Sequence, residues 1–203
     1  MENRGNCVLT HINLIIRKLL FIMISLDLET TGIDARKYAI VSVGAVEIEN
    51  PDNCFYEEIQ FDLTKLIDPR ALEINGFTEK NIKDPNKKNI SEVLRDFVDW
   101  TKNIENVTLL AHNAWFEKSF LVENLGRKEY EKVFGIRVLD LYGTFNSYCR
   151  TNYIEIPMRD NFCGKKIGWW KTRLDCSIYW VTREPKPHNA LTELKCAQKH
   201  IID

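Results

Sequence analysis

The sequence predicts a mixed α/β domain, in which an antiparallel meander of strands is followed by alternating helices and strands. The first third of the chain holds three strand-like segments with short connections, and the later part alternates helical and strand-like segments. The 203 residues suit one domain, and no repeat of solenoid length is present. We therefore expect one domain over residues 20–203, preceded by an extension without fixed structure over residues 1–19.

Three segments are expected to form the meander. The apolar run over residues 19–28 is typical of a strand buried on both faces. Residues 39–48 and 55–61 predict the second and third strands. The polar and glycine-containing segment after the first strand marks one turn, and Asn50-Pro51-Asp52 marks the next.

Helices and strands are expected to alternate in the rest of the chain. Apolar residues at helical spacing over residues 90–104 predict a helix that Asn89 caps, and a short strand is expected at residues 107–111. Asn113 is expected to cap the next helix, which Gly126 ends. The remaining expected elements are a strand at residues 135–139 and helices at residues 174–181 and 190–201.

The charge balance excludes a globally basic nucleic-acid-binding protein. Charged residues make up 28% of the chain, and the formal net charge is −1. Attraction to nucleic acid would therefore depend on bound metal ions or on local patches. Residues 159–186 carry seven basic residues against three acids, which predicts either such a patch or an ordinary solvated loop.

Cysteine usage and the N-terminal segment indicate a cytoplasmic protein. The six cysteines include no C-x-x-C pair, which is typical of reduced thiols in an intracellular protein. Arg17 and Lys18 interrupt the apolar residues near the N-terminus, so that this segment is too short and too charged for a membrane span. We expect no membrane association.

Two carboxylates stand at the end of the first expected strand, in the segment Asp27-Leu28-Glu29. Side chains alternate along a strand, so Asp27 and Glu29 are expected to lie on the same side. Neighbouring carboxylates repel each other unless a cation lies between them, and Mg²⁺ and Mn²⁺ prefer such ligands. The pair predicts a metal site, although a solvated strand end would also fit.

Two further segments share the pattern H-N-A-x-x-E. One runs from His112 to Glu117, where a strand is expected to pass into a helix, and the other from His188 to Glu193, before another expected helix. The helix dipole favours an acid in a first turn, so each acid also fits plain helix stabilisation. His188 follows Pro187 in a segment expected to be exposed, which makes it a candidate general base.

Together these segments resemble the motifs of the DEDDh 3′→5′ exonucleases, an RNase H-like family that includes proofreading subunits of bacterial replicative polymerases. The first family motif, D-x-E-T-T-G, is intact from Asp27 to Gly32. The second, H-N-x-x-F-D, ends here in Glu117, and the third, H-x-A-x-x-D, ends in Glu193. The resemblance extends over residues 20–202.

The resemblance implies an RNase H-like sheet and a phosphodiester hydrolase that uses two Mg²⁺ or Mn²⁺ ions. Asp27 would bridge the two ions. Glu29 and Glu193 would hold one ion, and Glu117 would support the other. His188 would act as the general base. The residues implied in substrate binding are Thr30, Thr31, Gly32, Ile33, Asn113 and Phe116, although Ile33 and Phe116 would also fit plain packing positions.

Two departures from the motifs leave alternatives open. Glu117 and Glu193 stand where the family has aspartate, and each extra methylene adds roughly 1.5 Å of reach. Paired metals lie only about 3.5–4 Å apart, so this length matters. We expect an active nuclease with altered geometry, acting on single-stranded DNA from a free 3′ end, with replication or repair proteins as partners. RNA trimming and nucleic-acid binding without cleavage are the alternative functions.

Overall fold

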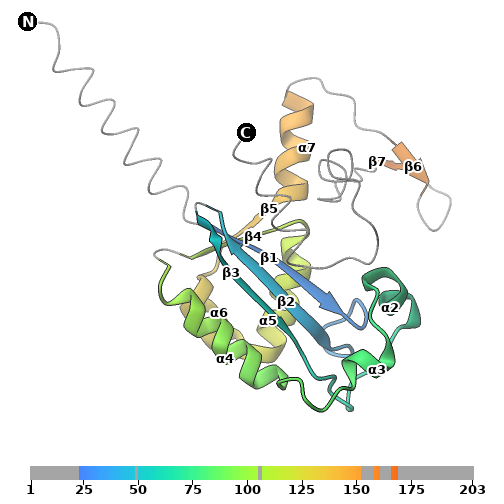
Figure 1. Ribbon diagram of the computed structural model, residues 1–203. Helices are drawn as coiled ribbons and strands as arrows, with labels where there is room; N and C mark the ends of the chain where they lie inside the picture. The colour runs from blue at the N-terminus through green and yellow to red at the C-terminus, as the bar shows by residue number, and fades with distance from the viewer. Residues whose placement is uncertain (1–22, 49, 105–106, 152–157, 161–165, 169–203) are drawn as a thin grey trace, which may run out of the picture.

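A five-stranded mixed sheet forms the centre of the computed structural model, which describes residues 23–48, 50–104, 107–151, 158–160 and 166–168. The strand order is β3-β2-β1-β4-β5 (Figure 1). The strands β1 to β3 form the antiparallel meander, whereas β4 and β5 add parallel to β1. The strands are β1 (Met23–Thr30), β2 (Ile40–Glu47), β3 (Asn50–Glu58), β4 (Thr108–Ala111) and β5 (Val138–Asp140). This arrangement confirms the predicted mixed α/β fold.

Helices pack against the sheet and beyond one of its ends. They are α2 (Pro69–Asn75), α3 (Glu79–Ile82), α4 (Ile90–Thr101), α5 (Ala114–Leu125), α6 (Arg127–Phe134) and α7 (Leu141–Thr151). A separate antiparallel pair consists of β6 (Met158–Asp160) and β7 (Lys166–Gly168). Figure 1 shows α4 and α6 side by side against the sheet, and α2 with α3 beyond the carboxyl end of β1.

The hydrophobic core lies between the sheet and the helices α4, α5 and α6. Phe97 of α4 is fully buried, and its ring lies 5.2 Å from that of Phe55 on β3 and 5.7 Å from that of Phe134 on α6. Phe120 and Leu121 of α5 are also fully buried in this cluster. The core therefore holds α5 against the strands that carry the candidate acids.

The third strand differs from its prediction, because β3 begins at Asn50 and ends at Glu58. Asn50-Pro51-Asp52, predicted as a turn, instead opens this strand. Proline has no N–H to donate to a neighbouring strand, and it is tolerated where one side of a strand is unpaired. The strand β3 lies at the edge of the described sheet, so its outer side requires no donor at this point.

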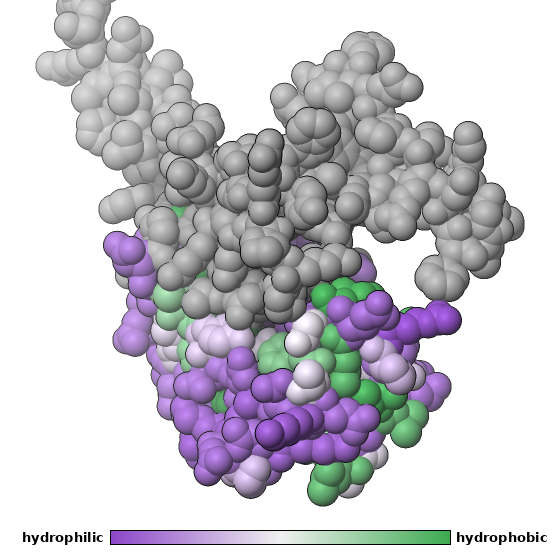
Figure 2. All heavy atoms as spheres, turned by 45° about the vertical axis from the view of Figure 1, so that its right-hand side comes forward, coloured by the Kyte–Doolittle hydropathy of each residue, from purple (hydrophilic) through white to green (hydrophobic). Residues whose placement is uncertain are grey.

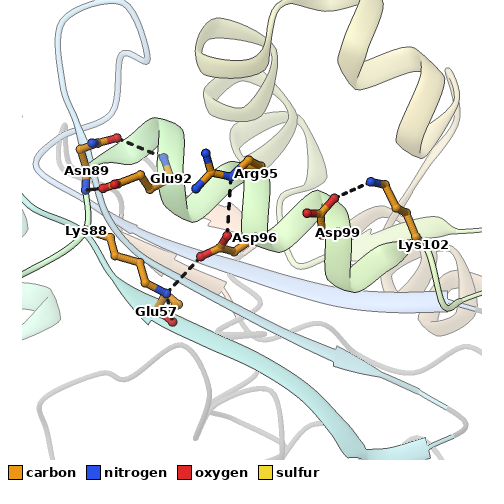
Figure 3. Close-up of polar contacts among 8 residues, drawn as sticks. All are labelled: Glu57, Lys88, Asn89, Glu92, Arg95, Asp96, Asp99 and Lys102. Atoms are coloured by element: carbon orange, nitrogen blue, oxygen red, sulfur yellow. Dashed lines mark hydrogen bonds and ion pairs between the residues drawn. The ribbon is translucent and has the colours of Figure 1, made fainter.

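The helix α4 confirms its predicted start. Asn89 accepts a hydrogen bond from the Glu92 N–H, and the Glu92 side chain accepts one from the Asn89 N–H, which forms a capping box. The neighbouring Lys88 joins this helix start to β3, because its Nζ lies 2.8 Å from Glu57 and 3.0 Å from Asp96 (Figure 3). These contacts hold α4 over the edge of the sheet.

Several predictions fall outside the described residues. They concern the N-terminal extension at residues 1–19, the helices at residues 174–181 and 190–201, and the side chains of the basic segment at residues 159–186. Within the described part of the chain, Cys54 carries a free thiol, and no helix is long and apolar enough to cross a membrane.

Candidate active site

The strand β1 carries two acids beyond the point where its pairing with β4 ends. It pairs with β2 along nearly its whole length, but with β4 only over Met23, Ile24 and Ser25. Asp27 and Glu29 therefore lie beyond the last β4 pairing. Both side chains are partly buried, and their spacing places them on the same side of the strand, as predicted. The chain leaves β4 at this level and starts α5 beside the two acids.

Two threonines hold the loop after β1 in place through hydrogen bonds. The Thr30 hydroxyl donates to the Gly32 carbonyl at 2.7 Å, and the Thr31 hydroxyl donates to the Leu66 carbonyl at 2.7 Å. The Thr31 N–H donates to the Ala39 carbonyl, and its carbonyl accepts from the Asp68 N–H. Thr30 and Thr31 are buried, so their side chains shape the loop from within.

Gly32 is required by close packing in this loop. A Cβ at this position would lie 2.4 Å from the Tyr38 ring, which is far inside van der Waals contact. The helix α2 supports the same loop from the other side, since the Asn75 amide donates to the Thr30 carbonyl at 3.1 Å. The backbone that follows Asp27 and Glu29 is therefore held by several elements.

Glu117 points into the protein beside the acids of β1. It lies in the first turn of α5 and is 5% exposed, and its Oε2 atom has no hydrogen-bond partner. Burial raises the pKa of the Glu117 carboxyl well above its ordinary value, and the negative charges of Asp27 and, more weakly, Asp140 raise it further. Its own backbone N–H opposes this shift. The longer acid that stands in the second motif is thus close enough to Asp27 for the two charges to interact.

The start of α5 is capped differently from the prediction. Asn113 occupies the cap position, but its side chain makes no hydrogen bond to the first turn. Instead, Asp140 at the end of β5 accepts from the Ala114 N–H at 2.9 Å and, with its other oxygen, from the Gly143 N–H at 2.6 Å. Asp140 was not among the predicted site residues. The signal for it was an acid directly after the strand expected at residues 135–139.

The predicted substrate-binding residues differ in exposure. Ile33 is 84% exposed at the tip of the loop after β1, and Leu66 and Ile74 are exposed near this loop and on α2. Figure 2 shows hydrophobic side chains among polar ones on the face that carries α2. Phe116 is partly buried, and its ring lies 4.9 Å from that of Phe120, so it is partly a packing residue. Asn113 is exposed.

The described acids fit a cation. Ionised Asp27 and Glu117 would repel each other in a partly desolvated place, and the buried Glu117 Oε2 lacks a partner. A divalent ion with oxygen ligands would relieve both costs. No group of three or more metal-binding side chains is close enough within the described residues alone. The predicted residues His188 and Glu193 lie outside those residues, whereas His112 directly follows β4 and is partly buried.

Comparison with known proteins gives consistent results. A family model described as an exonuclease matches residues 24–151. The PolC-type DNA polymerase III of Thermotoga petrophila is 35% identical over 96 residues, which cover 47% of this chain and 7% of that polymerase. The 3′-5′ DNA exonuclease Cap18 of Escherichia coli is 26% identical over 127 residues, which cover 59% of this chain and 65% of that enzyme. The chain thus spans only a small part of the polymerases that it matches.

Solved structures of similar fold cover most of this chain. Exonuclease I from Methylocaldum szegediense aligns with a TM-score of 0.65 and 17% identity, over 88% of this chain and 39% of that protein. E. coli exonuclease I, in complex with a dA16 oligonucleotide, aligns with a TM-score of 0.63 and 14% identity, over 88% of this chain and 39% of that protein. These likenesses confirm the predicted RNase H-like sheet.

Proposed function

The chain belongs to the exonuclease family whose model matches residues 24–151, and from that premise we propose that it removes nucleotides one at a time from the 3′ end of single-stranded DNA. The observation that carries the proposal is the buried Glu117 carboxylate, which faces the charge of Asp27 and has an unpartnered oxygen. A purely structural acid would be expected to find a hydrogen-bond partner or to stay in solvent. This placement favours a cation-dependent nuclease over a binding domain that has lost its metals.

DNA is the favoured substrate because the sequence relatives are named as DNA enzymes. A single strand is favoured because a structural neighbour was solved with the oligonucleotide dA16. RNA remains the competing substrate, since proteins distinguish the two mainly through the 2′-hydroxyl. Replication or repair proteins are proposed partners because the PolC-type relatives are replicative polymerases by name.

The cofactor proposed for the acid cluster is a pair of Mg²⁺ or Mn²⁺ ions, held by Asp27, Glu29, Glu117 and Glu193. Such ions supply an activated water and stabilise the charge that develops on the phosphate during hydrolysis. The water adds to phosphorus, the bond from phosphorus to the 3′ oxygen breaks, and the products are a nucleoside 5′-monophosphate and a shortened strand with a 3′-hydroxyl. His188 would take the proton from the attacking water.

The residues around the acids would position the substrate. The backbone of Thr30, Thr31 and Gly32 would lie along the terminal sugar, and the exposed Ile33 side chain would contact the last bases. Asn113 and Phe116, at the start of α5, would border the same strand of nucleic acid. Apolar contacts to base faces tolerate any base, so we expect little sequence preference.

Three substrates labelled at the 5′ end would test the proposal: single-stranded DNA, duplex DNA and single-stranded RNA of the same sequence. We expect stepwise shortening of the single-stranded DNA with Mg²⁺ or Mn²⁺ and none with EDTA. A faster reaction on RNA would replace DNA as the substrate. Binding of all three without shortening in either metal would overturn the nuclease proposal and favour the non-catalytic alternative.

A further inference from the structure

The side chain of Asp140 joins the starts of two helices to the end of one strand. Its Oδ2 accepts from the Ala114 N–H at 2.9 Å, at the first residue of α5. Its Oδ1 accepts from the Gly143 N–H at 2.6 Å, in the first turn of α7. Both carboxylate oxygens are therefore engaged by backbone amides, and such bonds to a charged acceptor are among the stronger hydrogen bonds in proteins.

The helix α5 has no local replacement for this contact. The helices α2 and α4 are capped by side chains directly before them, Asp68 and Asn89. Asn113 stands in the equivalent place before α5 and makes no capping hydrogen bond. The position of the first turn of α5 therefore depends on a residue 26 positions away in the chain.

The small residue at position 143 fits the same interpretation. A Cβ added to Gly143 would lie 3.2 Å from Asp140 Oδ1, which is tighter than most such contacts. Glycine thus lets the α7 backbone approach the carboxylate closely.

Resting on the proposed nuclease function, we propose that Asp140 is a positioning residue for the acid cluster: it fixes the first turn of α5, so that the Glu117 carboxylate faces Asp27. Glu117 lies three residues after Ala114, whose amide Asp140 holds, so a shift of the helix start would carry Glu117 with it. Asp140 does not need to touch a metal ion or the substrate for this role.

Direct Mn²⁺ binding to the whole chain, measured by the electron paramagnetic resonance signal of free Mn²⁺, would test the role without relying on activity. Asp140→Ala should weaken Mn²⁺ affinity by about 10–100-fold, the usual loss when a group that orients a metal ligand is removed. Asp140→Asn removes the same charge but keeps one acceptor oxygen, so its loss should be clearly smaller. The matched control is Asn89→Ala, which removes the cap of α4, a helix that carries none of the proposed ligands, and should leave Mn²⁺ affinity unchanged.

Each outcome decides the proposal, with melting temperatures used to confirm that every variant is folded. Unchanged affinity in Asp140→Ala would overturn it. Equal losses in the alanine and asparagine variants would also overturn it, because charge rather than hydrogen bonding would then account for the effect. If the four proteins differ in Mn²⁺ affinity as expected but the wild type cleaves no nucleic acid, the nuclease function is refuted and the positioning role stands. A wild-type protein that binds no Mn²⁺ would refute both.

Discussion

Glu117 is held in a place that opposes its own ionisation. The N-terminal turn of a helix normally favours an anion through the helix dipole. At Glu117, burial and the neighbouring charges of Asp27 and Asp140 outweigh this effect, so that the pKa of the carboxyl lies well above its ordinary value. Such conflicts are common at functional sites, because a bound cation can reverse them.

The pH dependence of stability would reveal this conflict. In the metal-free protein, the pKa of Glu117 lies above its ordinary value of 4.5. Between pH 4.5 and the raised pKa, the folded state therefore keeps a proton that the unfolded chain has lost. Its contribution to stability is therefore present below pH 4.5 and falls as the pH rises toward the folded pKa. Glu117→Gln should melt higher than wild type at pH 8 with EDTA, by about 2–4 °C for each kcal/mol recovered, and close to wild type at pH 4.

A second measurement checks that Glu117 acts as a ligand. Mn²⁺ should raise the melting temperature of wild type at pH 8 more than that of Glu117→Gln, because binding to the folded state alone stabilises it. If the variant melts below wild type at pH 8 without metal, the carboxyl is not strained there and our account of the site is wrong.

Asp27 is expected to be essential for turnover but not for folding. Asp27→Ala removes a side chain that would hold the metal ions, and little apolar packing is lost with it, because the side chain is polar and only partly buried. We expect turnover to fall by at least about 10³-fold, since a catalytic ion contributes several kcal/mol to the transition state. The melting temperature without metal should not fall, because a charge next to Glu117 is lost. Near-normal turnover of the folded variant in Mg²⁺ would exclude this role.

At the scale of elements, the sequence predicted those helices and strands whose limits are set by interactions between neighbouring residues. The helix α4 has both a capping box and regular apolar spacing, and its prediction is confirmed. The helix α2 was not predicted. Asp68 before Pro69 is typical of a helix start, but the seven residues of the helix are too few to show apolar residues at helical spacing. The strand β3 was misplaced because its tolerance of Pro51 depends on an edge position, which only the assembled sheet defines.

The cap of α5 shows the same limit more sharply. Asn113 is a favourable cap residue by type, and nothing in the local sequence indicated that it would not act as one. The acceptor comes instead from Asp140, which reaches α5 only because β5 pairs with β4. Contacts between elements distant in the chain are not visible to a pattern of local spacing.

The loop between β1 and β2 offers a test at this scale. Gly32→Ala would bring a Cβ to 2.4 Å from the Tyr38 ring, so either the ring or the loop must move. We expect a loss of about 1–3 kcal/mol in the free energy of unfolding, as for other overpacked sites, with reduced turnover because the loop follows the acids directly. Urea unfolding and cleavage assays would measure the two effects.

Tyr38→Ala provides the control for this variant, because it removes all of the ring atoms that the new Cβ would meet. In a double-mutant cycle, the pair should be more stable than the sum of the single losses predicts. Strict additivity would show that the ring does not set the requirement for glycine.

At the scale of the whole molecule, the site lies where the parallel strands end. The strands β1, β4 and β5 run in the same direction, and their carboxyl ends carry or lead into Asp27 with Glu29, His112 and Asp140. Ligands of α/β sheets commonly bind at this edge. The motifs predicted Asp27 and Glu29 as metal ligands but gave no sign of Asp140, and the order of the strands explains why the strand ends that carry these acids lie along one edge of the sheet.

Two histidines precede an acid in this chain, and their settings differ. His112 follows β4 directly, is partly buried and already interacts with other groups, so it is held at the junction of β4 and α5. His188 lies outside the described residues, and the sequence places it between Pro187 and a predicted helix, in a segment expected to be exposed. A general base must reach the attacking water and then release its proton to solvent, which favours the histidine of the third motif.

We therefore expect His188→Ala to lower turnover by about 10²–10⁴-fold, the usual contribution of a positioned base, while Mn²⁺ affinity is largely kept. His112→Ala should instead lower the melting temperature or raise KM, because it removes a partly buried side chain at the junction of β4 and α5. Turnover, KM and melting temperature measured for both variants would separate the two roles. If His112→Ala loses turnover at unchanged stability while His188→Ala stays active, the base is His112.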